Sequence, residues 1–476
     1  MKNFKGTAFI SVTLSLVLTL SGCAPSSDGV SLDPDNPITI TVWHYFSGAL
    51  LNSFDAMISD FNGTVGMEQG IIVEGVSFGS IGELDASVRA SANQEVGSME
   101  LPNIFASFPD NAYIIQELGL LANLDDYFTV EQQQEYYPAF IERGRIGVDG
   151  ELRIFPFAPA TEIMMLNDTD WQPFADAYNL SYTDLQTMEG LAHVAQLYYS
   201  WSDGKAFFGR DAIANLFVIG SRQFGVEIFE VADRDVTINV DEEVMRKIWD
   251  HYYVPFISGY FSVFGRFRSD DVRAGDLLAY VGSTTSAVFF PEEVTIDGIT
   301  RPIQPRILPP PLFEGANSVM ASQGPGMVVT LATPEEQYAS LIFLRWFTEP
   351  SQNLRFSALT AYLPVREVAM DATLVRAAAD EAGVHLRPIT EETISIALEA
   401  VKSSEMHATR AFDGAVAARA VLTNNLREMA AANREEILYL IENGVPREEA
   451  IARFSTEEEF TAWVTELREQ LIEAVN

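Results

Sequence analysis

The sequence predicts an α/β protein with two domains. Three observations lead to this prediction. Short β-branched runs alternate with segments of helical periodicity from Ile38 onward, a pattern typical of a parallel sheet covered by helices. Apolar residues make up 47% of the chain, which is enough for extensive hydrophobic cores. The chain has 476 residues, and this length favours two domains over a single core.

The N-terminus has the features of an export signal that ends at a cysteine. Lys2 and Lys5 precede an apolar stretch from Ala8 to Leu20, and Ser21-Gly22-Cys23 follows it. The stretch is shorter than the about 20 residues that a membrane-spanning helix needs. It resembles a bacterial lipobox, in which the cysteine after the cleavage site carries the lipid. We therefore expect Cys23 to be lipidated and to hold the protein at a membrane surface.

Composition argues against several classes of protein. Cys23 is the only cysteine, so the chain cannot form an intramolecular disulfide. The formal net charge is −37, which argues against nucleic acid as a partner because phosphate binding needs clustered Lys and Arg. The sequence has no Cys/His cluster, no His-Glu-x-x-His and no Gly-x-x-x-x-Gly-Lys-Ser/Thr segment. We expect no metal and no cofactor.

Folding should begin at Ile38, after a segment rich in turn formers. Apolar spacing and β-branched runs then predict a succession of strands and helices. The predicted strands are Ile38–Trp43, Ile71–Val73, Arg153–Phe157, Ile163–Leu166 and Leu277–Val281, and the predicted helices are Leu50–Phe61, Leu84–Ala92 and Thr183–Tyr199.

Capping signals mark the helices of the second half of the chain. Thr333, Pro334 and Glu336 have the pattern that opens a helix, and this helix should run to about Phe347. From about Glu391 onward the chain should be almost entirely helical. Asn443-Gly444 should close one helix and Pro446 should open the next. Ser455 and Glu458 are expected to form a further capping box.

Several segments, in order along the chain, resemble the bacterial extracellular solute-binding proteins of family 1, the carbohydrate-importer type. Each motif is loose, but their order over more than 300 residues makes the resemblance specific. Leu166-Asn167 stands where the family usually has Tyr-Asn. The segments are Ile38-Thr-Ile-Thr-Val-Trp-His-Tyr45, Leu118–Phe128, Gly150–Asn167, Ala279–Thr285, Ala339–Phe347 and Thr360-Ala-Tyr-Leu-Pro-Val-Arg366.

The resemblance implies a two-lobed, type II periplasmic-binding-protein-like fold, with discontinuous lobes joined by a hinge and a helical C-terminal part. The expected division is a signal peptide over 1–22, a lipidated tether over 23–37, a first lobe from 38–146 plus 314–365, and a second lobe from 147–313 plus 366–476. The implied function is that of a monomeric substrate-binding lipoprotein of an ABC importer, which closes on a solute and delivers it to a membrane permease. ATP would be hydrolysed by separate subunits.

The ligand site of such a protein should lie on loops that follow strands, where aromatic rings cover sugar faces and polar groups bind hydroxyls. Trp43, Glu162 and Tyr362 are the leading candidates, although an aromatic residue after a strand is more often part of the core. The candidate set is Trp43, His44, Tyr45, Ser47, Asp110, Thr161, Glu162, Ser283, Thr284, Thr285, Gln323, Gly324, Tyr362 and Arg410.

Two alternatives to sugar binding remain open. The Trp-His opening, the Tyr-Leu-Pro segment and Arg410 together resemble the glycerol-3-phosphate-binding subgroup, and an arginine fork suits a phosphate. Gly75-Val-Ser77-Phe-Gly79 matches the nucleophile elbow of a serine hydrolase. However, that elbow usually follows several strands, and the chain has no His-Gly-Gly-Gly segment for an oxyanion hole. We therefore expect a binding protein and not an enzyme.

Overall fold

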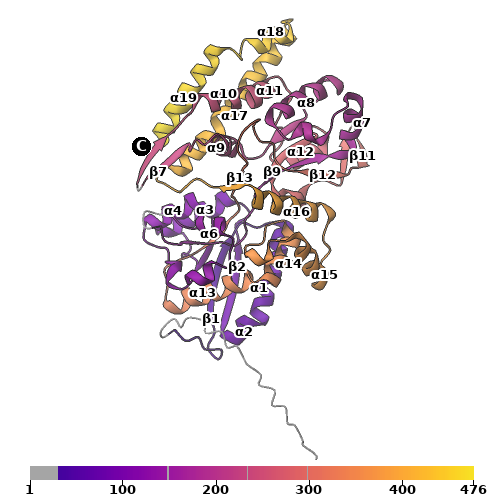
Figure 1. Ribbon diagram of the computed structural model, residues 1–476. Coiled ribbons are helices and arrows are strands. Elements are labelled where there is room, and N and C mark those ends of the chain that lie inside the picture. Colours follow the sequence, from indigo (N-terminus) through magenta and orange to yellow (C-terminus); the bar gives the residue numbers. More distant parts are fainter. Residues whose placement is uncertain (1–29, 147–149, 233, 297, 476) are drawn as a thin grey trace, which may run out of the picture.

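The computed structural model describes residues 30–146, 150–232, 234–296 and 298–475. Two lobes lie one above the other in Figure 1, with a helical layer from the C-terminal part of the chain on the upper lobe. The predicted signal peptide and Cys23 lie outside the described residues. Within those residues, no helix combines the length and the apolar character needed to cross a membrane.

The first lobe is built on a five-stranded sheet with the order β2-β1-β3-β14-β4. β1 (Ile38–His44) pairs in parallel with β2 (Ile71–Ser77) and β3 (Ile104–Ser107), as the strand–helix alternation predicts. β14 (Gly326–Val329) lies between β3 and β4 (Ile154–Phe155) and is antiparallel to both. The helices of this lobe are α1 (Gly48–Gly63), α2 (Val65–Gln69), α3 (Ile81–Ala92), α4 (Pro109–Glu117), α5 (Val130–Gln133), α6 (Pro138–Glu142) and α13 (Pro334–Phe347).

The second lobe has a four-stranded sheet with the order β12-β5-β9-β6. Its strands are β12 (Pro305–Leu308), β5 (Glu162–Asn167), β9 (Ala279–Ser283) and β6 (Phe208–Arg210). β5 runs antiparallel to both of its neighbours, whereas β6 and β9 are parallel. The lobe also contains α7 (Asp168–Tyr178), α8 (Met188–Trp201), α9 (Ile213–Gln223), α10 (Glu242–Ile248), α11 (Val254–Ile257) and α12 (Arg268–Ala274), and the hairpins β7 (Phe229–Ala232)–β8 (Asp235–Ile238) and β10 (Glu293–Ile296)–β11 (Ile299–Pro302).

The C-terminal helices belong to the second lobe. α17 (Ala415–Glu442), α18 (Arg447–Ala452) and α19 (Glu457–Val475) pack against it and share its core. Trp463 of α19 lies 5.4 Å from Trp249 between ring centroids, and both rings are buried. Burying such large aromatic side chains contributes strongly to packing, so these helices are an integral part of the lobe.

The chain crosses between the lobes three times. The first two crossings, Ala158–Ala160 and Gln323–Pro325, lie side by side and are hydrogen-bonded to each other. β13 (Val319–Ala321), before the second crossing, pairs with β15 (Glu405–His407) of the third. On the way to β15 the chain forms α14 (Pro350–Thr360), α15 (Ala372–Glu381) and α16 (Pro388–Ser403), whose core includes residues of the second-lobe sheet. These paired segments form the hinge.

Most predicted elements are confirmed, and three details differ. β4 pairs with β14 in the first-lobe sheet, whereas the boundary at residue 147 assigned it to the second lobe. The helix predicted over 183–199 is a 3₁₀ turn followed by α8, because the Thr187 hydroxyl accepts from the Gly190 N–H and starts a new helix. Thr456, and not Ser455, caps α19 by accepting a hydrogen bond from the Glu459 N–H.

Candidate ligand-binding cleft

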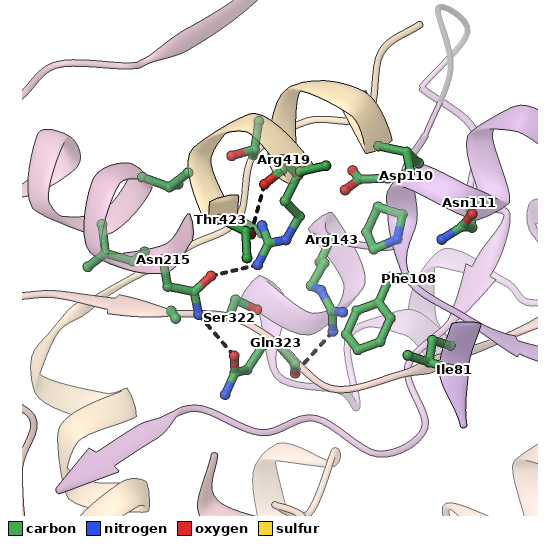
Figure 2. A pocket seen from close by; sticks show the side chains of 18 of the residues that line it. Ile81, Phe108, Asp110, Asn111, Arg143, Asn215, Ser322, Gln323, Arg419 and Thr423 are labelled. Atoms are coloured by element: carbon green, nitrogen blue, oxygen red, sulfur yellow. Dashed lines mark hydrogen bonds between the residues drawn. The ribbon is translucent and has the colours of Figure 1, made fainter. Parts of the chain in front are cut away.

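A cleft of about 520 Å³ lies between the lobes. The first lobe contributes the N-terminus of α4 and the end of α6, the hinge contributes the segment after β13, and the second lobe contributes α9 and the start of α17 (Figure 2). Ligands of open α/β sheets bind beyond the carboxyl ends of the strands, and the first-lobe side of the cleft follows the carboxyl end of β3. The polar and aromatic residues that line the cleft include Asp85, Phe108, Asp110, Asn111, Arg143, Asn215, Ser322, Gln323, His407, Thr409, Arg419, Thr423 and Asn424.

The first-lobe wall is set by the turn from β3 into α4. Pro109 occupies the first turn of α4, which places Asp110 and Asn111 at the start of the helix and in the cleft. The Asn111 side chain donates to Asp85 Oδ2 at 2.7 Å and accepts from Arg89 Nη1 at 2.6 Å. Burial raises the pKa of Asp85 to about 6, and burial also raises the pKa of Asp110.

Arg143 connects this wall to the hinge. It follows α6, and its guanidinium donates to the backbone carbonyls of Gln323, at 3.2 Å, and Gly324. The same group lies 5.8 Å from the centroid of the Phe108 ring. Burial lowers the pKa of Arg143 to about 10, and the nearby charge of Arg419 acts in the same direction. At that pKa the group is still charged at neutral pH, so it presents a fixed positive charge to the cleft.

The second-lobe wall is organised around the side chain of Asn215, on α9. Its Oδ1 accepts from Arg419 Nη2 at 2.7 Å, and its Nδ2 lies 3.1 Å from both Gln323 Oε1 and Glu162 Oε1 (Figure 2). Glu162 in turn forms a buried ion pair with Arg210. Because every member of this network is held by a neighbour, the polar groups at the back of the cleft are pre-organised.

The predicted site residues fall into three groups, and the first lies in or against the cleft. Asp110 and Gln323 line it directly. Glu162 lies behind Asn215 and holds it in position. The carbonyl of Gly324 binds Arg143, and the residue has a φ of +91°, a backbone conformation that suits glycine.

The second group lies close to the cleft lining without forming part of it. The phenol of Tyr45 is hydrogen-bonded to Tyr362 and lies within the electrostatic reach of Arg143. Tyr362 is buried and stacks on Phe356, with 5.9 Å between ring centroids. Burial raises the pKa of Tyr45 to about 12, so its hydroxyl stays protonated at neutral pH.

The third group does not line the cleft. Trp43, His44, Thr161 and Thr284 are buried in the lobes. Ser283, the last residue of β9, and Thr285 form a hydrogen-bonded turn, and Ser47 is exposed before α1. Arg410 is exposed and donates to the Val231 carbonyl at 3.4 Å.

His44 illustrates why residues of the third group fold inwards. Its ring packs against Phe46 and Phe54, and its Nδ1 accepts a hydrogen bond from the Phe46 N–H at 3.2 Å. Burial lowers its pKa to about 4, so it is neutral at physiological pH. In the same way Trp43 packs on Phe78, 4.9 Å away between centroids. Strand ends of this lobe therefore supply core residues as well as cleft residues.

Sequence reasoning missed most of the lining. Arg143, directly after α6, and Arg419, on α17, look like ordinary surface charges, while Asn215 lies within an apolar helix. The one available signal was Asn215 itself, a polar residue in a run of buried apolar neighbours from Ile213 to Ile219. Such a residue needs a polar partner. The sequence does not show which residue this is, because Gln323 reaches Asn215 only once the hinge has folded.

Several solved structures are similar to this chain over most of its length. The crystal structure of UgpB from Mycobacterium tuberculosis, in complex with glycerophosphocholine, has a TM-score of 0.65 and 18% identity, over 93% of this chain and 100% of that chain. The galacto-N-biose-/lacto-N-biose I-binding protein of the ABC transporter from Bifidobacterium longum has a TM-score of 0.63 and 12% identity, over 93% and 98%. The cyclic α-maltosyl-1,6-maltose binding protein from Arthrobacter globiformis has a TM-score of 0.61 and 19% identity, over 90% and 100%.

At these identities the likeness establishes the fold, which confirms the predicted two-lobed, periplasmic-binding-protein-like architecture. No curated protein matches the sequence significantly. The family itself comes from the sequence model described as bacterial extracellular solute-binding protein, which matches residues 56–382, more than half of the chain. The chain is therefore a member of the bacterial extracellular solute-binding proteins, an exported family whose members bind solutes.

Proposed function

We propose that this protein captures a sugar or oligosaccharide in the cleft between its lobes and delivers it to the permease of an ABC importer. The observation that carries the proposal is the composition of the cleft, to which the first lobe, the hinge and the second lobe all contribute polar side chains. A ligand that contacts all three favours the closed arrangement of the lobes, and the binding energy drives closure. The structurally similar proteins named above include two sugar-binding proteins.

The side chains of the cleft suit a hydroxylated solute. Asn111, Asn215 and Gln323 offer amide donors and acceptors, and Asp110 offers a carboxylate to hydroxyl hydrogens. Phe108 is the aromatic ring available to cover a sugar face from the first lobe. We infer that these five residues form the solute site, with Glu162 and Gly324 as positioning residues behind them.

Of the three features that suggested the glycerol-3-phosphate alternative, the arginine is not placed in the cleft. Arg410 is exposed and donates to the carbonyl of Val231, outside the cleft lining. Arginines do reach the cleft, but they are Arg143 and Arg419. Any preference for a charged solute would therefore depend on these two residues.

We further propose that Cys23 anchors the protein by a lipid and that 23–37 is the tether. Leu32 packs against the first-lobe core, and the Ile38 N–H donates to the Gly70 carbonyl at 2.9 Å. The chain thus enters β1 at its amino end, whereas the cleft lies beyond the carboxyl end of β3. This arrangement would direct the cleft away from the anchored end.

The anchor is tested by expression in a bacterium with labelled palmitate. Wild-type protein should take up the label and fractionate with membranes, while Cys23→Ala should do neither. Label that persists in Cys23→Ala would show that the cysteine is not the lipid attachment site.

Solute capture is tested with the mature chain without its anchor. A thermal-shift screen of neutral and acidic sugars should identify a ligand, and small-angle scattering at saturation should then show a smaller radius of gyration. Asn111→Ala should weaken that ligand by about 1–3 kcal/mol, because a buried polar contact is lost. The exposed Asn443→Ala is the matched control. An unchanged radius in a saturated sample would exclude closure.

A further inference from the structure

We propose that the solute carries an anionic group, a carboxylate or a phosphate, which binds between Arg143 of the first lobe and Arg419 of the second lobe. The inference rests on the proposed function, because it concerns the solute of the same cleft. It narrows the substrate class from sugars in general to acidic ones. In Figure 2 the Arg419 side chain extends from α17 toward Asn215, and the Arg143 side chain extends toward the backbone of Gln323.

Both guanidinium groups keep donors for a ligand. A guanidinium has five N–H donors. Arg143 donates to the Gln323 and Gly324 carbonyls, and Arg419 donates to Asn215 Oδ1. Among the described residues, no carboxylate oxygen lies within 4.0 Å of either group, although both line the cleft. The hydrogen bonds to the hinge and to Asn215 of α9 hold the two guanidinium groups in place, and their other N–H groups remain available to a ligand.

The balance of charge in the cleft favours an anion. Asp85 is bound by Asn111 and lies near the charge of Arg89. Asp110 is then the one lining carboxylate that faces two arginines, Arg143 and Arg419, and both of them lower its pKa against the effect of burial. Arg89, which lies behind the lining, offsets Asp85, and Asp110 offsets one of the two remaining arginines, so these five groups together carry a net charge of +1. The chain as a whole carries −37, so the charge around the cleft is opposite in sign to that of the whole chain.

The location of the two arginines on opposite lobes connects charge to closure. Each charge opposes the approach of the other, which is visible in the effect of Arg419 on the pKa of Arg143. An anion between them changes this repulsion into two attractions that strengthen as the lobes approach. A neutral sugar of the same shape would leave the repulsion in place. The anionic group is therefore both a recognition element and a trigger for closure.

The experiment compares Arg419→Gln with Arg410→Gln in the mature chain. Both changes remove one arginine charge from an exposed side chain, but only Arg419 lines the cleft. The first probe is inorganic phosphate or sulfate in a thermal-shift assay, at constant ionic strength with chloride as reference. Wild type and Arg410→Gln should be stabilised by the oxyanion more than Arg419→Gln. Equal stabilisation of all three proteins would overturn the proposal.

The second probe is a set of matched pairs that differ in one charged group: galactose and galacturonate, glucose and glucose 6-phosphate, glycerol and glycerol 3-phosphate. Calorimetry should show that wild type prefers the acidic member, and that Arg419→Gln lowers its affinity by about ten- to a hundredfold. The affinity of the neutral member should fall much less, because it loses only the support that Arg419 gives to Asn215. Preference for galacturonate would identify a carboxylate, and preference for the phosphorylated members a phosphate.

The two proposals fail in different ways. Neutral sugars that bind as tightly as acidic ones, with no effect of Arg419→Gln, would overturn the anion site and leave sugar capture intact. Phosphate stabilisation that depends on Arg419, in a protein that binds glycerol 3-phosphate but no sugar of the screen, would overturn sugar capture and support the anion site. Increasing sodium chloride should weaken the acidic ligands selectively, because salt screens exposed charges.

Discussion

Replacement of Gly324 by alanine tests how closely the two hinge segments must approach. Gly324 has a φ of +91°, and a Cβ there would lie 2.3 Å from the Ala158 carbonyl oxygen and 2.8 Å from the Ala160 nitrogen. The positive φ alone costs a non-glycine residue about 1–2 kcal/mol. Relief of the clash would also separate the hinge segments, which exchange two hydrogen bonds between Ala160 and Gln323 at 2.8 and 3.0 Å. Each contributes about 1 kcal/mol net.

The expected loss is therefore about 3–4 kcal/mol of unfolding free energy for Gly324→Ala. Gly315→Ala is the matched control, since Gly315 has a φ of +73° but no atom within 4 Å of the added Cβ. It should lower the free energy of unfolding only by the cost of a positive φ in alanine, about 1–2 kcal/mol. Urea denaturation followed by tryptophan fluorescence measures both variants. If the two variants lose the same stability, the hinge segments are not held as closely as described, and the reasoning fails.

Three further predictions concern single polar groups. Ser77 Oγ donates to the Phe46 carbonyl at 2.7 Å, so Ser77→Ala should lower the free energy of unfolding by about 1 kcal/mol. If wild type hydrolyses esters and this variant does not, the hydrolase alternative gains support instead. The pKa of Asp85 is about 6 in the folded protein and 3.8 in the unfolded chain. Because folding disfavours the ionised carboxylate, stability falls as the pH rises from the lower to the higher of these two values. Asp85→Asn should therefore melt a few degrees above wild type at pH 7.5 but not at pH 3.5, and parallel melting curves would contradict the assignment. Glu117 and Arg234 form an exposed ion pair across the lobes at 3.1 Å. Since such a pair contributes at most about 1 kcal/mol, Glu117→Gln should weaken ligand binding, measured by calorimetry, by no more than about fivefold. A larger loss would show that the pair is one of the contacts that stabilise the closed form.

The fold was more accessible from the sequence than the cleft. Apolar periodicity and capping residues are local signals, and they predict β1, α1 and the capping box at Thr333 correctly. β4 was assigned to the wrong lobe because its partner, β14, lies more than 150 residues away. Local pattern carries no information on such a pairing.

The cleft depends on long-range contacts of the same kind. Asp110 and Gln323 were found because they follow strands. Arg143 and Arg419 were missed because each is placed by contacts with distant residues, the hinge carbonyls in one case and Asn215 in the other. Trp43 and His44 follow the expected pattern for ligand contacts, yet aromatic neighbours draw both into the core. Strand ends predict where a site is, but not which side chains face it.

The position of β14 in the first-lobe sheet also constrains the order in which the protein can be made. β14 lies between β3 and β4 in the sheet. In the sequence, however, all four strands of the second-lobe sheet come between β4 and β14. A nascent chain therefore lacks the strand that joins β4 to the rest of the first-lobe sheet until residue 329 has been synthesised. The first core can close only after about two thirds of the polypeptide exists. For an exported protein this delay is favourable, because a chain that folds late can cross a membrane while it is still extended.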